Sequence, residues 1–388
     1  METFYYEQPV AIDFGIGKLE TLPTIIEQLG FSKGLLISTP SMVKNGTAEK
    51  LIALCDGKLE GIFSDIQPNP TLTNTDNCAE VLREGGYDFA VALGGGSILD
   101  CAKVACFVAK KDQPTSVYFY KEMLVDEPGI PLIAIPTTSG TASEITSASV
   151  LTDTEKGVKA PMNYKYFYPA YALVDPALTF SCPPHVTAAS GIDVLAHSLE
   201  AFYGKKHQPY TDMAAEKAAK LVFENLLTAY KEPENVQARV NMSLASVTAG
   251  MAFNLTQTAA AHACSYPLTQ DFGIPHGEAC AFTLAAFWRL NSSCGEPEVR
   301  ERLEAFSQRC GFENAVALAD FIDEMKSEMG LCMTLEDVGV TSNELLDQLV
   351  ASSFAPNMQN NPVEITPESL KVFYKELAEV DVAEVELL

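Results

Sequence analysis

One stretch of the chain decides the fold that we expect: Tyr87-Asp88-Phe89-Ala90-Val91-Ala92-Leu93, which runs directly into Gly94-Gly95-Gly96-Ser97. The mostly apolar run before the glycines is typical of a strand in a sheet that is buried on both faces. The residues after the glycines, Ser97 to Val108, have the composition of a helix. A strand, a glycine turn and a helix in this order indicate the first half of a βαβ unit.

Similar patterns flank this stretch over the first half of the chain. Two further strands are predicted at Gly34 to Thr39 and at Pro131 to Ile135. Helices are predicted at 47–54, 75–84 and 97–108. Because strands and helices alternate, we expect an α/β domain with a parallel sheet over residues 1–180.

After Asp175-Pro176 the strand signals end, and the rest of the chain is predicted to be helical. The predicted helices cover 184–203, 212–230, 235–253, 279–290, 296–310 and 315–329. We therefore expect an all-helical domain over residues 181–388.

The composition excludes several classes of protein. The chain has 388 residues, a formal net charge of −25 and 47% hydrophobic residues, as in an ordinary globular protein. The negative charge disfavours binding to nucleic acid or to an anionic membrane. No export signal and no apolar run of ~18 residues is visible, so a cytoplasmic location is expected. Ten cysteines without a C-x-x-C pair are expected to be reduced thiols.

Two polar loops are candidates for holding a nucleotide cofactor. Gly94, Gly95, Gly96 and Ser97 would let the backbone approach a diphosphate, whose oxygens the N–H groups of the helix start can bind. Tight turns also use glycine, and the run matches neither G-x-G-x-x-G nor a Walker loop. The second loop, 136–144, leaves another strand, and its Thr137, Thr138 and Ser139 are the better candidates for cofactor contacts. An N-cap with a polar turn would explain Ser143 and Glu144.

Four residues suggest a divalent metal site: Asp193, His197, His262 and His276. Three of the five histidines of the chain fall into this set. Asp193 and His197 are spaced i, i+4 and would share one face of a helix. A carboxylate and three imidazoles can hold a transition metal and leave a position open for a substrate oxygen. The alternative for each histidine is a partly buried structural residue, which is our interpretation of His185 and His207.

Several motifs together resemble the iron-containing (group III) alcohol dehydrogenase family. They are Gly94 to Ser97, Pro136 to Thr141, Asp175-Pro176, Gly191 to Glu200, Pro275-His276-Gly277 and Asn361-Pro362. The resemblance implies an α/β dinucleotide-binding domain over residues 1–180, an all-helical metal-binding and substrate domain over residues 181–388, a cleft between them, and a homodimer. It also implies Fe²⁺, or Zn²⁺ or another divalent ion, on Asp193, His197, His262 and His276, and an NAD(P)-dependent interconversion of alcohols and aldehydes. Besides residues of the two loops, the resemblance implies further cofactor-binding residues: Thr39, Pro40, Pro70, Asp100, Ser143 and Lys159.

The chain departs from the family pattern at three positions. Tyr266 stands four residues after His262, where many members have a histidine, so Tyr266 and His262 are our catalytic candidates, with Tyr266 as a proton donor or relay. Thr269 replaces a common glycine. The strand end Ser38-Thr39-Pro40 lacks the aspartate of many NAD-specific members, which leaves NADP(H) possible although NAD(H) is favoured.

The stretch Ser265 to Thr269 looks like the branch of the family that reduces sulfoacetaldehyde or phosphonoacetaldehyde. Such anionic two-carbon aldehydes need a cationic pocket, for which Lys165, Lys205, Lys206 and Arg289 are candidates, although each can be an ordinary surface charge. The alternatives are a dehydrogenase of general short-chain alcohols or diols, a cyclase of the dehydroquinate-synthase type, and a non-catalytic protein that binds metal or nucleotide.

Overall fold

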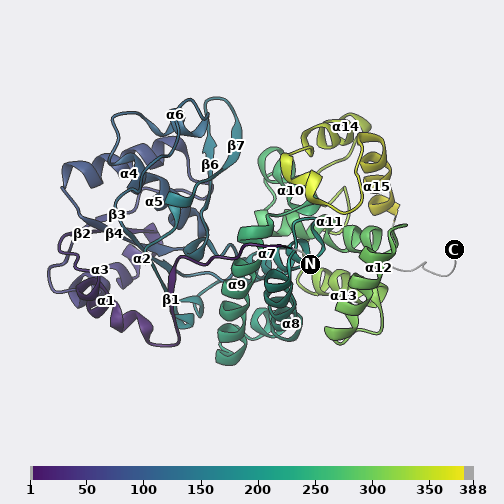
Figure 1. Cartoon of the computed structure of the whole chain (residues 1–388), viewed down its shortest axis with the longest axis horizontal. Coiled ribbons are helices and arrows are strands. Elements are labelled where there is room, and N and C mark those ends of the chain that lie inside the picture. The colour runs from purple at the N-terminus through teal and green to yellow at the C-terminus, as the bar shows by residue number, and fades with distance from the viewer. Residues whose placement is uncertain (1–2, 380–388) are drawn as a thin grey trace. The chain divides into compact units, whose positions relative to one another are not determined.

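The computed structural model describes residues 3–379, which form two compact units (Figure 1). The first unit is Glu7–Cys182, and the second begins at Pro183. The N-terminal residues 3–6 belong to the second unit, where the rings of Phe4 and Tyr6 lie 5.4 and 5.6 Å from the ring of Tyr210. The predicted division near residue 180 did not include this return of the N-terminus to the helical unit.

The first unit contains a six-stranded parallel sheet in the order β1-β8-β5-β4-β2-β3. The strands are β1 (Ala11–Phe14), β2 (Gly34–Ser38), β3 (Leu59–Phe63), β4 (Phe89–Gly94), β5 (Leu132–Pro136) and β8 (Tyr171–Val174). The predicted parallel sheet is thus confirmed, and the three strands predicted from the sequence are its central β2, β4 and β5. An antiparallel pair, β6 (Ala148–Asp153) and β7 (Val158–Asn163), lies outside this sheet.

Helices cover both faces of the sheet. They are α1 (Leu22–Gln28), α2 (Pro40–Lys44), α3 (Thr47–Leu54), α4 (Leu72–Glu84), α5 (Gly96–Val108) and α6 (Thr115–Phe119). Alternate residues of β2 point to opposite faces. Leu35 and Ile37 belong to one core with residues of α4 and α5, whereas Leu36 belongs to a second core with residues of α1 and α3. Burial on both faces explains the continuous apolar runs in these strands.

The second unit is helical, as predicted. Its helices are α7 (Pro184–Tyr203), α8 (Pro209–Lys231), α9 (Val236–Thr256), α10 (Ala260–Asp271), α11 (His276–Ser292), α12 (Pro297–Arg309), α13 (Ala315–Glu328), α14 (Asn343–Ser352) and α15 (Pro367–Glu379). Every residue of α7 from Gly191 to Tyr203 is buried. No helix among residues 3–379 is long and apolar enough to cross a membrane.

Glycines let two helices approach α7 closely. A β-carbon added at Gly277, in the first turn of α11, would lie 1.9 Å from the carbonyl oxygen of Ala189 and 2.8 Å from Cβ of Asp193. A β-carbon at Gly191 would lie 2.2 Å from a methyl group of Leu226 on α8. The close contact at Gly277 fixes the start of α11 against the middle of α7.

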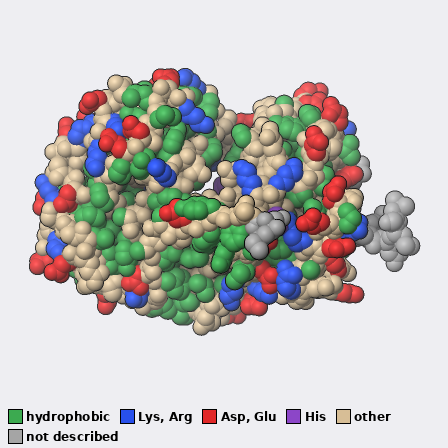
Figure 2. Space-filling model, viewed as in Figure 1, with side chains coloured by type: hydrophobic (Ala, Val, Ile, Leu, Met, Phe, Trp, Pro, Cys, Tyr) green, Lys and Arg blue, Asp and Glu red, His purple; other side chains and the backbone are tan. Residues whose placement is uncertain are grey.

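The surface carries charges of both signs. Figure 2 shows Lys and Arg interspersed with Asp and Glu on the face in view, with apolar side chains between them. The excess of acidic groups follows from 51 Asp and Glu against 26 Lys and Arg in the sequence.

A small group of charged side chains is buried in the α/β unit. Lys103 on α5 and Glu144 in the loop after β5 are each 2% exposed. The ammonium of Lys103 donates to the carbonyl oxygen of Ala148 at 2.8 Å. Burial raises the pKa of Glu144 to about 7, although the charge of Lys103 opposes this shift. Burial lowers the pKa of Lys103 to about 8, against the attraction of Asp100 and Glu144.

We predict that Glu144→Gln removes a pH dependence of stability. The pKa of Glu144 rises from 4.5 to about 7 on folding, so its contribution is fully present below pH 4.5 and is lost as the pH rises to 7. The free energy of unfolding of the native protein should therefore fall relative to that of the variant over this window, by on the order of 3 kcal/mol. Urea unfolding at each pH, monitored by the hydrogen exchange of β4 and β5, measures the difference in the free energy of unfolding. The exposed Glu122→Gln is the control, and parallel pH profiles for Glu144→Gln and native protein would contradict the assignment.

Candidate metal centre and cofactor loops

Helix α7 places three functional side chains on one face. Asp193, His197 and Glu200 are spaced i, i+4 and i+7, which returns to the same side of the helix. All three are buried, with exposures of 2%, 5% and 0%. Because buried charged groups need a partner, this face must meet other polar groups in the interior.

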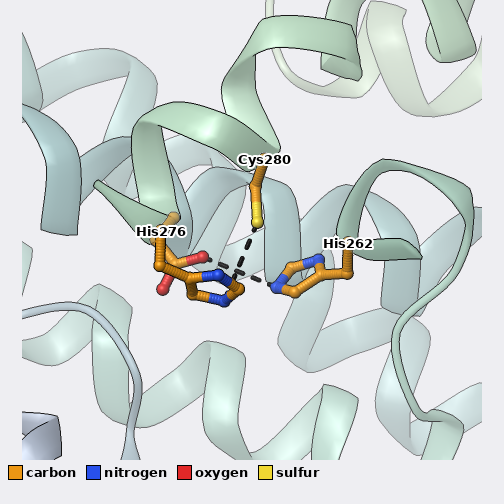
Figure 3. Close-up of side chains that lie close together, drawn as sticks. His262, His276 and Cys280 are labelled. Atoms are coloured by element: carbon orange, nitrogen blue, oxygen red, sulfur yellow. Dashed lines mark hydrogen bonds and ion pairs between the residues drawn. The ribbon is translucent and has the colours of Figure 1, made fainter. Parts of the chain in front are cut away.

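Four donor atoms from three helices meet at this face: Asp193 of α7, His262 of α10, and His276 and Cys280 of α11. Their ligand atoms all lie within 4.8 Å of one another. Figure 3 shows the side chains of His262, His276 and Cys280 pointing toward one another. His276 and Cys280 share a face of α11 because they are four residues apart.

The donor set fits a divalent metal ion. Oδ1 of Asp193 and Nε2 of His262 are buried 3.5 Å apart, and neither has a hydrogen-bond partner among the described residues. Two such atoms are costly to bury unless a proton or a metal ion lies between them. Ligand atoms that lie ~2.1 Å from one tetrahedral ion are roughly 3.4 Å apart, so small side-chain movements would close the set around an ion.

Glu200 orients His262. Its Oε2 lies 2.5 Å from Nδ1 of His262, and its Oε1 accepts the backbone N–H of His262 at 3.1 Å. Burial raises the pKa of Glu200, but the facing imidazole outweighs burial and keeps the pKa below its usual value. A carboxylate that accepts a hydrogen bond from the Nδ1–H group orients the ring so that Nε2 faces Asp193, as in many metal-binding histidines.

His197 lies beside the four donor atoms. Its Nδ1 is 3.9 Å from Oδ2 of Asp193, and its ring centroid is 4.6 Å from that of His262. The ring stacks on Phe253 at 4.0 Å. The structure therefore brings together all four residues of the predicted set, and the role of His197 as a ligand stays a prediction. Outside this group, His185 is exposed and His207 pairs with Asp212 at 3.0 Å.

The electrostatics of the site favour a positive charge next to Asp193. Burial raises the pKa of Asp193, but the charges of His197, His276 and His262 outweigh it and hold the pKa well below its usual value. Burial lowers the pKa of His262, yet Cys280, Glu200 and Asp193 together raise it well above its usual value. The carboxylate thus attracts cations, and protons compete with a metal for the imidazoles.

Tyr266 lies next to the donor set on α10. Its ring is parallel to that of His276 to within 2°, with the centroids 6.4 Å apart. The side-chain amide of Asn357 donates to the phenol oxygen at 3.4 Å. Burial raises the pKa of Tyr266, so the phenol keeps its proton and can donate it. Its role as a proton relay stays a prediction.

The glycine loop lies at the switch point of the sheet. After β2 the chain crosses to β3 on one side, and after β4 it crosses to β5 on the other. Thr39 and Pro40 follow β2, and Gly94 to Ser97 close β4 and open α5, so both predicted segments flank the position where parallel sheets bind ligands. The hydroxyl of Thr39 caps α2 by accepting the N–H of Met42 at 3.1 Å.

The loops after β4 and β5 touch each other. A β-carbon at Gly95 would lie 3.3 Å from Oγ1 of Thr138, and one at Gly96 would lie 2.8 Å from Thr141. The backbone N–H of Thr137 donates to the carbonyl oxygen of Gly94 at 3.0 Å. The absence of a side chain at Gly95 and Gly96 therefore lets the loops after β4 and β5 approach each other, and it also leaves the backbone accessible to a ligand. Ser139 follows Thr138 in the loop after β5.

The other predicted cofactor residues make contacts within the protein. The hydroxyl of Ser143 donates to Asp100 at 2.5 Å, and the same carboxylate accepts the N–H of Val150 at 2.8 Å. The carbonyl oxygen of Pro70 accepts the N–H of Thr152 at 2.9 Å, and Lys159 donates to Asn69 at 2.9 Å. These bonds tie the β6–β7 hairpin to the rest of the unit, and contact of these residues with a cofactor stays a prediction.

Two residues of the site were not predicted from the sequence. The spacing in the sequence could have pointed to both, since Glu200 is seven residues after Asp193 and Cys280 is four residues after His276. Neither spacing shows that α10 and α11 meet α7, which only the folded chain reveals.

Comparison with known proteins identifies the family. The model of the iron-containing alcohol dehydrogenase family matches residues 9–176, and that of its C-terminal domain matches residues 187–378. Alcohol dehydrogenase 4 of Schizosaccharomyces pombe is 32% identical over 369 residues, which cover 93% of this chain and 86% of that protein. Sulfoacetaldehyde reductase of Bilophila wadsworthia is 37% identical over 270 residues, 69% of this chain and 70% of that protein.

A solved structure matches the whole fold. Sulfoacetaldehyde reductase from Bifidobacterium kashiwanohense, in complex with NAD⁺, superposes with a TM-score of 0.94 at 42% identity and covers 98% of this chain and 100% of its own. The family models together match most of both units, and the motifs at 94–97, 136–141, 191–200 and 275–277 lie at the sites described above. The chain belongs to the iron-containing alcohol dehydrogenase family and is an alcohol dehydrogenase or aldehyde reductase.

Proposed function

We propose that this protein reduces an anionic two-carbon aldehyde, such as sulfoacetaldehyde, with NADH at the metal centre. The observation that carries the reaction class is the buried pair of Asp193 and His262, whose facing atoms lack hydrogen-bond partners among residues 3–379. Two relatives named sulfoacetaldehyde reductase, at 37% and 42% identity, support the substrate class. The NAD⁺ in one of them supports the cofactor.

The residues of the chain have separate tasks in this reaction. Asp193, His262 and His276 would hold the metal, with His197 beside them, and Glu200 keeps Nε2 of His262 turned toward Asp193. When bound, the metal supplies a Lewis acid for the substrate carbonyl and the nicotinamide supplies the hydride. The phenol of Tyr266, which accepts a hydrogen bond from Asn357, would give a proton to the product oxygen.

The N–H groups at the start of α5 would bind the cofactor diphosphate. Gly95 precedes this helix without a side chain, and no cap side chain bonds to its first turn. A helix start of this kind is a ready site for phosphate oxygens.

The anionic end of the substrate needs a cation, and the four candidates differ in their surroundings. Arg289 is neutralised by Asp320 and Asp323, each at 2.7 Å. Lys165 lies over the ring of Tyr166 in the α/β unit. Lys205 donates to the carbonyl oxygen of Gln359 at 3.1 Å.

Lys206 has the most suitable surroundings. Its ammonium bonds to the side chain of Gln257, which precedes Thr258. Asn357 donates both to Thr258, at 3.0 Å, and to the phenol of Tyr266. Lys206 is therefore connected, through Gln257, its neighbour Thr258 and Asn357, to Tyr266, and we propose it as the residue that attracts the anion. The homodimer and the cytoplasmic location stay predictions.

We predict metal-dependent aldehyde reduction with a preference for anionic substrates. Chelator-treated protein should be inactive, and added Fe²⁺ or Zn²⁺ should restore oxidation of NADH. Sulfoacetaldehyde should exceed acetaldehyde, propanal and glycolaldehyde by ~100-fold in kcat/KM, about 2.7 kcal/mol. Lys206→Ala should narrow this preference, whereas the control Lys231→Ala, whose lysine pairs with Glu328, should retain it.

Other outcomes of this assay would identify the alternatives. Equal turnover of neutral and anionic aldehydes would leave a general short-chain alcohol or diol dehydrogenase. Bound metal and cofactor without turnover of any aldehyde would contradict the reductase and favour a cyclase of the dehydroquinate-synthase type or a non-catalytic protein.

We also predict that Glu200→Gln weakens metal binding 10- to 100-fold, as is usual when the group that orients a metal-binding histidine loses its charge. The amide can still accept a hydrogen bond from Nδ1 of His262 but no longer stabilises charge on the imidazole. Competition with a chelator gives the metal dissociation constant. The exposed Glu224→Gln on α8 should bind metal like the native protein, and native affinity in Glu200→Gln would show that the carboxylate charge is not needed.

A further inference from the structure

Cys280 lies in the donor set without a function in the reaction described above. Its side chain is fully buried, and its sulfur lies 3.8 Å from Nε2 of His276. It also lies within 4.8 Å of the ligand atoms of Asp193 and His262. Figure 3 shows the thiol pointing from α11 toward the two imidazoles.

The surroundings of this thiol point to a ligand. Oδ1 of Asp193 and Nε2 of His262 are buried in the same cluster and have no hydrogen-bond partner among residues 3–379. The space that Cys280 faces is therefore lined by atoms that a cation would satisfy. A thiol that only fills space in the core is normally surrounded by apolar groups rather than by a carboxylate and imidazoles.

Another buried cysteine provides a comparison within the same unit. Cys264 lies on α10, two residues after His262, and is also fully buried. Its thiol faces Tyr374 and Ser353 rather than the donor set. Among the described cysteines, Cys280 alone belongs to the cluster of potential ligands.

We propose that Cys280 is a metal ligand and that, with Asp193, His262 and His276, it gives the site an affinity for thiophilic ions such as Zn²⁺ and Co²⁺. This proposal rests on the metal centre of the proposed function. When the ion binds, the S–H bond breaks, the proton leaves to solvent, and the sulfur–metal bond forms without oxidation or reduction. A thiolate prefers Zn²⁺ to harder ions, so the residue would set which metal the site retains.

The spectrum of Co²⁺-loaded native protein tests the proposal without a variant. A sulfur ligand should give an intense charge-transfer band in the near ultraviolet, and X-ray absorption of the Zn²⁺ form should show one sulfur at ~2.3 Å. Co²⁺ and Zn²⁺ bound with only nitrogen and oxygen ligands would overturn the role of Cys280 and leave the metal centre intact. A protein that binds neither ion would overturn the metal centre itself.

Matched variants identify the thiol. Cys280→Ser should lose the band and bind Zn²⁺ at least about tenfold more weakly, since loss of an orienting partner alone has an effect of that size. Cys264→Ser should keep the band and the native affinity. A Cys280→Ser protein that retains both, with native circular dichroism, would overturn the proposal. If Cys280→Ser fails to fold, the native X-ray absorption result decides.

Discussion

A carboxylate in the interior of a helical unit is the constraint on which the site depends. Asp193 lies in the middle of α7, where every residue from Gly191 to Tyr203 is buried. Burial raises the pKa of its carboxyl group, and the imidazoles from the same helix and from α10 and α11 outweigh that effect and lower the pKa. The charge of Asp193 is thus stable only because other helices bring positive or potentially positive groups to it.

The backbone contacts of α7 maintain this arrangement. Gly277 allows the first turn of α11 to rest on the carbonyl oxygen of Ala189, which places His276 beside Asp193. Glu200, two turns further along α7, holds both the backbone and the imidazole of His262. The position of the metal-binding atoms therefore follows from helix packing, and a substitution that separates α11 from α7 would disturb the site without touching a ligand.

The sequence predicted the parts of the fold whose signal is local. β2, β4 and β5 are central strands with every residue buried, so they stand out as apolar runs before glycine, proline or hydroxyl residues. The bounds of α7 agree with the prediction, from Pro184 to Tyr203. Strands β1 and β8 were missed because they have only four residues each, too few to show a period. Helix α10 was missed because Pro267 lies inside it and proline normally disfavours a helix interior.

The candidate site was predictable only in part for a related reason. The spacing of Asp193 and His197, and the scarcity of histidine, predicted which residues would gather. The partner of His262 and the approach of Cys280 depend on contacts between residues far apart in the chain, such as Glu200 and His262, which are separated by 62 positions. Such contacts have no local signal in a single sequence.

The most direct test of the metal centre is to locate the ion. Crystals of the protein loaded with Zn²⁺ should give a strong anomalous difference peak among α7, α10 and α11, about 2.0–2.2 Å from Asp193 and from the imidazoles of His262 and His276. A peak in that position would confirm that the buried carboxylate and imidazoles exist to hold a metal. The absence of a peak there, in crystals that bind the ion elsewhere or not at all, would contradict the account.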